Sequence, residues 1–269
     1  MTAFAQHFAY EFRTGVRSAT LMFMNYLFPL GLYLMLGFIM PELNEPFREV
    51  IIPAMITVSV MAATLLGIPD QLVNAREKGI FRSYKINGVP AISIMSIPAL
   101  ATVLHLCVVA ILITVSAPIL FDATSPTNLL GLVLVFAATG CACSGLGVLI
   151  GVVAPDTRAT VLLSQAFFLP SMLIGGVMIP YNTLPDGAKM VSRLLPATHA
   201  MNAFNGLAMD VGADFSPWGS VLVLVTGGIL AFALSLYLFS WDRHNTTRRA
   251  HPLLALLALV PYVTSFVLK

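Results

Sequence analysis

Residues 128–153 read NLLGLVLVFAATGCACSGLGVLIGVV, and none of these side chains carries a charge. An α-helix rises about 1.5 Å per residue, so about 20 apolar residues cross the ~30 Å hydrocarbon layer of a bilayer. Backbone N–H and C=O groups find no water in that layer, and the alternation typical of a membrane β-barrel is absent here. The stretch therefore predicts a membrane-spanning α-helix.

Apolar stretches of similar length recur on both sides of residues 128–153. Hydrophobic residues make up 58% of the chain, above the roughly 45–50% usual in soluble domains. We therefore expect an all-α, polytopic membrane protein with a single transmembrane domain over residues 1–269. A shorter apolar segment, 253–268, suits either a seventh span or a segment in the membrane interface. The other predicted spans cover residues 21–40, 50–68, 91–120, 159–179 and 218–241.

The basic residues indicate which way the chain lies in the membrane. Lys and Arg collect on cytoplasmic loops. With the N-terminus in the cytoplasm, ten of the fourteen fall on the inner side and three on the outer side, while the side of Lys269 depends on the last segment. The inner residues are Arg13, Arg17, Arg76, Lys78, Arg82, Lys85, Arg158, Arg243, Arg248 and Arg249, and the outer ones are Arg48, Lys189 and Arg193.

Missing motifs argue against several classes of function. The chain has no G-x-x-x-x-G-K-[ST] loop, so it does not hydrolyse nucleotide by that route. The six long stretches contain no Asp, Glu, Lys or Arg, which disfavours a self-sufficient ion-coupled transporter. Apart from cysteines, their one ionisable side chain is His105, expected to bond to a neighbouring helix or, alternatively, to relay protons. We predict no enzymatic activity, no metal or cofactor bound by this chain and no nucleic-acid partner.

Residues 70–90, DQLVNAREKGIFRSYKINGVP, form the most highly charged stretch of the chain. Charged residues such as Arg76 and Glu77 mix with apolar ones at near-helical spacing, which is typical of a short amphipathic helix. Such a helix can dock into a groove on a partner protein. The alternative is a solvated loop whose basic residues follow the positive-inside rule.

Residues 4–18, before the first span, form a second amphipathic segment. Phe4, Phe8, Phe12 and Val16 recur at every fourth position, so one face of a helix here is apolar. We expect a helix that lies along the cytoplasmic interface of the membrane.

Small residues recur four apart in the fourth predicted span, at Gly140 and Ser144 and at Gly147 and Gly151. This spacing lets two helix backbones approach closely. It serves either packing within the chain or a face that lines a dimer or a substrate path.

The segment 175–210 is too apolar for an ordinary outer loop. A broken helix with re-entrant pieces is tolerated where protein or a water-filled cavity covers it. The two interpretations are a re-entrant hairpin over 180–210 that gates the outer side and a hairpin in the membrane interface. The residues that interrupt helices here are Gly175, Gly176, Pro180, Pro185 and Pro196.

Taken together, these stretches resemble the permease subunit of type-2 ATP-binding-cassette exporters. NAREKGIFRSYKINGVP, residues 74–90, is similar to that family's first cytoplasmic loop, which has a charged pair, a glycine, a short helix and a proline that opens the third span. GGVMIPYNTLPDGAKMVSRLLPATHAMNAFNG, residues 175–206, is similar to the family's signature after the fifth span. There a Gly-Pro break leads to a re-entrant hairpin and a Leu-Pro pair, here Leu195 and Pro196.

The resemblance implies a mechanism and partners. Two permeases, identical or different, would pack side by side in the lipid of a bacterial cytoplasmic membrane. Each would bind a separate ATPase subunit, which would hold ATP and Mg. The first cytoplasmic loop would be a coupling helix in a groove of the ATPase, with Phe81 and Tyr84 as its anchors. The coupling residues would be Arg76, Glu77, Lys78, Gly79, Phe81, Arg82 and Tyr84, and the outer gate Gly175, Gly176, Pro180, Pro185, Leu195 and Pro196.

The predicted function is the membrane-spanning subunit of an ATP-driven exporter. The apolar spans favour an amphipathic drug, an antibiotic or a lipid-like molecule as the substrate. The alternatives are a polysaccharide or lipid-linked glycan exporter, a stand-alone secondary transporter and a membrane protein with no transport function, such as an assembly factor.

Overall fold

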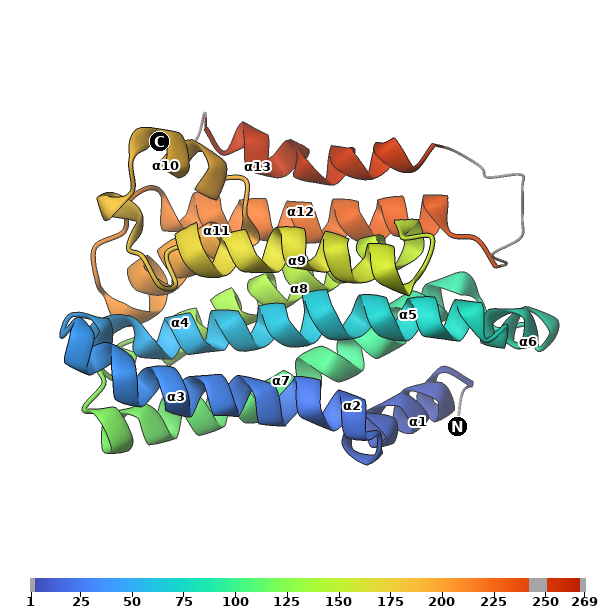
Figure 1. Cartoon of the computed structure of the whole chain (residues 1–269), viewed down its shortest axis with the longest axis horizontal. Coiled ribbons are helices and arrows are strands. Elements are labelled where there is room, and N and C mark those ends of the chain that lie inside the picture. Colours follow the sequence, from blue (N-terminus) through green and yellow to red (C-terminus); the bar gives the residue numbers. More distant parts are fainter. Residues whose placement is uncertain (1–2, 242–250, 267–269) are drawn as a thin grey trace.

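The computed structural model describes residues 3–241 and 251–266. Within these ranges the chain is helical and has no strand, and its long helices run side by side along the longest axis of the molecule (Figure 1). Six helical segments are long and apolar enough to cross a membrane, as the sequence predicts. They cover Ala19–Leu43, Phe47–Glu77, Ala91–Phe121, Leu129–Val153, Thr157–Ile174 and Pro217–Leu238.

The first two spans are each built from more than one helical element, because a π-helical segment interrupts them. In chain order the α-helices are α1 (Ala3–Arg17), α2 (Ala19–Met22), α3 (Phe28–Leu43), α4 (Phe47–Met61), α5 (Ile68–Glu77), α6 (Ile80–Ile86), α7 (Ala91–Phe121), α8 (Leu129–Val153), α9 (Thr157–Ile174), α10 (Asp186–Ser192), α11 (Pro196–Phe204), α12 (Pro217–Leu238) and α13 (Val260–Thr264). The π-helical segments are η1 (Phe23–Leu27), η2 (Ala62–Gly67) and η4 (Asn205–Met209), and the 3₁₀ helices are η3 (Tyr181–Thr183) and η5 (Pro252–Leu259).

Short polar side chains begin three of the spans. The side-chain oxygens of Asn128, Asp156 and Ser216 each accept a hydrogen bond from the backbone N–H three residues further on, at 3.1, 2.8 and 3.1 Å. Each bond satisfies one of the N–H groups that the first turn of a helix leaves without a partner. These caps fix the starts of α8, α9 and α12 close to the predicted boundaries.

Two spans differ in length from their predictions. The fifth was expected over 159–179, but α9 ends at Ile174, because Gly175 caps it and Gly176 adopts a left-handed φ of 84°. The second was expected over 50–68, but its helix continues to Glu77 and carries the chain well beyond the apolar stretch. Hydrophobicity alone marks where lipid ends and does not mark where a helix ends.

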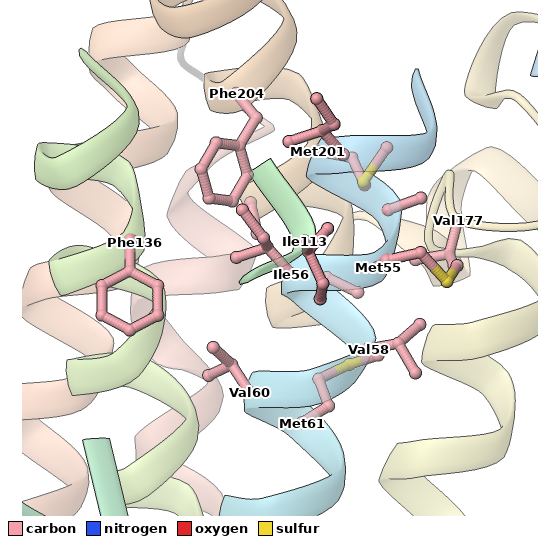
Figure 2. Close-up of a cluster of buried hydrophobic side chains, with 14 of the residues drawn as sticks. Met55, Ile56, Val58, Val60, Met61, Ile113, Phe136, Val177, Met201 and Phe204 are labelled. Carbon is pink, nitrogen blue, oxygen red and sulfur yellow. The ribbon is translucent and has the colours of Figure 1, made fainter. Parts of the chain in front are cut away.

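The core of the molecule lies around the second and fourth spans. In their most apolar windows 94% and 78% of the residues are buried, against 22–39% in the other four spans. Figure 2 shows part of this core, where side chains of α4, α7, α8 and α11 meet around Ile56 and Phe204. The other four spans therefore surround this pair and turn apolar faces outward.

Glycines let α8 approach its neighbours at backbone distance. A Cβ atom on Gly147 would overlap the carbonyl oxygen of Thr64 in η2. A Cβ atom on Gly145 would stand 2.6 Å from the carbonyl oxygen of Gly228 in α12. Any larger residue at either position would force two helix backbones apart.

The other small residues of α8 also pack inside the chain. A Cβ atom on Gly140 would stand 3.2 Å from the side chain of Val103, and one on Gly151 would stand 3.0 Å from that of Leu72. The hydroxyl of Ser144 donates to a carbonyl of its own helix. Of the two interpretations of this spacing, packing within the chain is therefore the one that the structure supports.

The two ends of the bundle differ in the segments that they carry (Figure 1). α1, α6 and the α8–α9 connection lie at one end, and α10 lies at the other with the α3–α4 and α7–α8 connections. We call these the inner end and the outer end, after the predicted orientation. Four of the basic residues counted for that orientation, Arg243, Arg248, Arg249 and Lys269, lie outside the described residues.

The last apolar segment lies alongside α12. η5 and α13 pack against that helix, and they run from the inner end towards the outer end (Figure 1). Near its end the ring of Tyr262 lies 5.7 Å from that of His199, which belongs to α11. A 3₁₀ helix rises about 2.0 Å per residue, so this segment gains length over an α-helix of the same number of residues. Residues 267 and 268 of the predicted segment lie outside the described residues.

We predict that Gly147→Ala destabilises the protein, because the new methyl group meets a backbone carbonyl that cannot move away. Overpacking of this kind costs about 1–3 kcal/mol in the free energy of unfolding. Unfolding in mixed micelles measures the change. Gly31→Ala is the matched control, since nothing lies within 4 Å of a Cβ atom at that position. Equal losses in both variants would contradict this account of the packing.

We also predict that Thr264 lies on the outer side and Ser83 on the inner side of the membrane. Both residues are exposed, and Ser83 belongs to α6 at the inner end whereas Thr264 belongs to α13, at the end of the segment that runs towards the outer end. In a variant without Cys107, Cys141 and Cys143, a cysteine at position 264 should react with an impermeant maleimide in intact cells. A cysteine at position 83 should react only after the membrane is opened. Labelling of both from one side would rule out this arrangement of the last segment.

Candidate functional site

At the inner end the chain turns between α5 and α6. Gly79 makes this possible with a left-handed φ of 72°, and nothing lies within 4 Å of a Cβ atom built there. The N–H groups of Lys78 and Gly79 donate to the carbonyls of Asn74 and Arg76, at 3.0 and 3.1 Å. The glycine of the predicted coupling loop therefore has a conformational role, and the predicted short helix is α6.

Phe81 attaches α6 to the bundle. Its side chain is only 4% exposed, and its ring centroid lies 5.5 Å from that of Phe239, which follows α12. The sequence prediction made Phe81 an anchor for a partner protein, but in the structure its ring points into its own chain. The large apolar side chains that α6 leaves exposed are Ile80 and Ile86, and Ile86 is 80% exposed.

Arg76 and Glu77 tie α5 to the connection between α8 and α9. The guanidinium of Arg76 donates to the carbonyl oxygens of Val152, at 3.0 Å, and Ala154. The carboxylate of Glu77 accepts a hydrogen bond of 3.2 Å from the hydroxyl of Thr157. Two of the predicted coupling residues thus hold the inner end of the chain together.

The remaining predicted coupling residues lie on the surface of this end or next to α1. Lys78 and Arg82 are exposed. Tyr84 is half-buried, and its ring centroid lies 5.6 Å from the imidazole of His7. The exposed side chains of the α5–α6 turn and of α6 therefore include three cations, Lys78, Arg82 and Lys85, and the two isoleucines of α6.

The amphipathic N-terminal helix packs against α7 through a buried histidine. The ring of His105 stacks on Phe12, with the centroids 4.3 Å apart, and its Nε2 bonds to the carbonyl of the same residue at 2.9 Å. Its Nδ1 bonds to the hydroxyl of Tyr26 at 2.7 Å. Both ring nitrogens of the one histidine within the predicted spans are engaged, as expected for a contact between neighbouring helices.

A cavity of about 660 Å³ lies at the inner end between α1, α5 and α9. Its lining combines apolar side chains with polar ones, among them Glu11, Asp70 and Gln71. Residues of the predicted coupling region reach it, since Lys78 and Tyr84 are among those that line it. Sequence reasoning did not predict this cavity, although a Ser-Gln pair at 164–165 within an apolar span was a usable signal.

At the outer end the predicted gate residues occupy the boundaries of short elements. Gly175 caps α9, Pro180 precedes η3 and Pro185 precedes α10, while Leu195 and Pro196 begin α11. Proline is suited to the first turn of a helix, where its missing N–H has no partner to lose. The prediction that this segment re-enters the membrane and acts as a gate stays a prediction.

A second cavity, of about 230 Å³, lies under this outer segment. Gly175, Gly176 and Pro180 line it together with residues from 44–50 and 198–215. Pro185, Leu195 and Pro196 are not part of its lining. The structure thus brings three of the six predicted gate residues to one cavity.

Arg193 and Asn202, which sequence reasoning passed over, organise the outer segment. The Nε of Arg193 donates to the hydroxyl of Tyr181 at 3.0 Å, and its guanidinium lies 4.6 Å from the centroid of Phe215. The buried amide of Asn202 bonds to the backbone of Phe215 and to the hydroxyl of Ser220. The signal in the sequence was their polarity, since both Arg193 and Asn202 lie inside a predicted hairpin that is otherwise largely apolar.

The amino-acid sequence of this chain is similar to one known family of membrane proteins and to one bacterial protein. Residues 2–209 match the model of a family described as "ABC-2 type transporter". The chain is also similar to the "Putative transport permease YvfS" of Bacillus subtilis (strain 168), with 25% identity over 189 residues, which cover 69% of this chain and 74% of that protein. No solved structure matches significantly. Because the family model covers more than half of a chain that carries six apolar spans, the protein belongs to the ABC-2 type transporter family.

Proposed function

We propose that this chain is the membrane-spanning subunit of an ATP-driven exporter. ATP and Mg would bind to a separate ATP-binding-cassette ATPase subunit, and a second permease would complete the translocation path. The location proposed is the cytoplasmic membrane of a bacterium, with α1 and α6 on the cytoplasmic side. Membership of the ABC-2 family supports the permease role, and the surface of α6 supports the partner.

The observation that carries the proposal is the attachment of α6. This short helix turns an exposed surface with Ile80, Ile86 and Arg82 outward, while Phe81 holds it against the bundle. Exposed apolar side chains beside charges suit a docking surface, because the apolar groups supply affinity and the charges fix the orientation. A helix that is packed against the bundle can transmit a displacement by the ATPase subunit to the spans. A solvated loop would change its own conformation instead.

Closure of the ATPase subunits on ATP would then act on α6. The inner end moves as a unit, since Arg76 and Glu77 join α5 to the α8–α9 connection. ATP binding would supply a difference in affinity between two arrangements of the helices, and this difference shifts the population from one to the other. The substrate would leave past the outer segment.

The substrate that we propose is amphipathic, of the drug, antibiotic or lipid-like class. The cavity at the inner end supports this, because its wall combines polar groups with the apolar side chains of Leu21, Met24 and Leu66. The cavity under the outer segment is roughly a third as large, and the proposed gate would act there.

We predict that Arg82→Glu separates the chain from its ATPase subunit and leaves membrane insertion intact. The new negative charge would lie on the proposed contact surface. Loss of a complementary charge there, or repulsion between like charges, weakens docking about tenfold or more. Co-purification of the ATPase subunit with the tagged permease, and ATP-driven uptake into inverted vesicles, measure the effect.

Lys189→Glu is the matched control for this charge reversal. Lys189 lies in α10 at the opposite end of the bundle, so its reversal should leave the ATPase subunit bound. Unchanged co-purification and transport in the Arg82 variant would show that α6 is not the coupling surface. Transport by the wild-type chain in vesicles without any ATPase would overturn the proposed function itself.

A further inference from the structure

The cavity at the inner end carries ionisable and polar groups to which the proposed function gives no role. Its volume of about 660 Å³ falls within the range of about 300–1,000 Å³ that is typical of ligand sites. α1 contributes Glu11, α5 contributes Asp70, and α9 contributes Ser164 and Gln165. Three separate segments thus converge on one space.

Two carboxylates give this cavity its electrostatic character. Glu11 accepts a hydrogen bond of 3.1 Å from the amide of Gln71, and its other oxygen lies 3.7 Å from the imidazole of His7. Burial raises the pKa of Glu11, and His7 and Gln71 oppose that rise. Asp70 also lines the cavity, and within the part of the chain that the structure describes its carboxylate makes no hydrogen bond or ion pair.

The third charged group of the lining, Lys78, has the opposite sign. Its side chain is exposed at the inner end, where water screens it, whereas Glu11 and Asp70 are half-buried. The deeper part of the cavity is therefore negative, and a positively charged ligand group is favoured there.

The wall on α9 presents polar atoms that lack partners. Ser164 is 2% exposed, and its hydroxyl makes no hydrogen bond to any described residue. The side-chain oxygen Oε1 of Gln165 is buried and equally without a partner. Burial of a polar atom without a partner is costly, because the atom loses its hydrogen bonds to water, and a ligand that binds the atom removes this cost. Both residues line the cavity, and a rotation of either side chain would bring its oxygen to an N–H group of a ligand.

Apolar groups line the same cavity beside these polar ones. Leu21, Met24 and Leu66 contribute from the first two spans, and Val161 contributes from α9. Met24 lies in η1 and Leu66 in η2, so π-helical segments form part of the wall. Segments of this kind interrupt helices most often at functional sites.

We propose that this cavity binds a molecule with an ammonium group and an apolar body. The ammonium group lies next to the carboxylates of Asp70 and Glu11 and near the side chains of Ser164 and Gln165. The apolar body lies along Leu21, Met24 and Leu66. The inference rests on the proposed function, because it makes the site the place where an exporter takes up a cationic amphiphile from the inner side.

The test uses the full chain in phosphatidylcholine nanodiscs, without any ATPase subunit. Calorimetry compares decylammonium, decyl sulfate and decanol, with empty nanodiscs subtracted. We expect decylammonium to bind at least about tenfold more tightly than the other two. Asp70→Asn should weaken decylammonium binding about tenfold and leave decanol binding unchanged, since it removes the charge and keeps the shape.

A second variant tests the site by gain of affinity, which a folding defect cannot imitate. Gln165→Glu adds a carboxylate of the same shape and should tighten decylammonium binding about tenfold. Asp186→Asn, at the outer end, is the matched control and should change nothing. Equal affinity for the three decyl compounds, or no effect of either cavity variant, would overturn the proposal.

The ammonium group could belong to a soluble amphiphile or to a lipid headgroup, and the lipid composition separates them. Phosphatidylethanolamine added to the nanodiscs should compete with decylammonium if the natural ligand is a lipid with an amine headgroup. No competition identifies a soluble amphiphile. In both cases the site is selective for ammonium.

The binding measurements on the cavity and the co-purification experiment on α6 test separate claims. If the ATPase subunit co-purifies but the cavity does not select for charge, the inference fails and the proposed function stands. If the cavity selects for charge but no ATPase subunit associates with the chain, the proposed function fails and the binding site remains.

Discussion

The contact of α8 with η2 on one side and α12 on the other holds this protein together. At Gly147 and Gly145 the helix backbones meet with no side chain between them. Lipid tails are as apolar as leucine, so burial of apolar surface does little to hold spans together in a membrane. The main attraction between spans is then dispersion. Because dispersion weakens steeply with distance, it stabilises helices that are in direct contact. The buried pair of spans exists because glycines permit that contact.

The inner end is an extension of the same core. The helix that contains η2 continues beyond the apolar stretch as α5, and Arg76 binds the end of α5 to the end of α8. Phe81 and Phe239 join α6 to the end of α12. α5 continues from η2, and η2, α8 and α12 are the elements joined at backbone distance further inside, so a displacement of α6 is passed to the centre of the bundle. A docking surface that is packed against the core in this way suits a permease subunit whose energy comes from a separate ATPase subunit.

Local chemistry in the sequence predicted part of the candidate site. Charged and apolar residues at near-helical spacing predicted the short helix α6, and Gly175 and Gly176 predicted a break in the fifth helix, although that span was expected to run to residue 179. The direction of Phe81 was not predictable, since a half-apolar helix can turn its aromatic side chain to a partner or to its own chain. The polar pair at 164–165 was a signal for the cavity between α1, α5 and α9, but its partners were not predictable, because residues about 150 positions apart form the walls.

The sequence by itself determined the class of the protein, the number of long spans and the approximate places where these spans begin. Those features depend on the cost of bringing a charge or an unbonded backbone group into lipid, and each residue carries that cost wherever the chain folds. The tertiary structure alone decided which glycines face which backbones, where Arg76 and Phe81 point, and which polar groups share a cavity. These outcomes depend on contacts between distant segments, whose free energy exists only once the helices have packed.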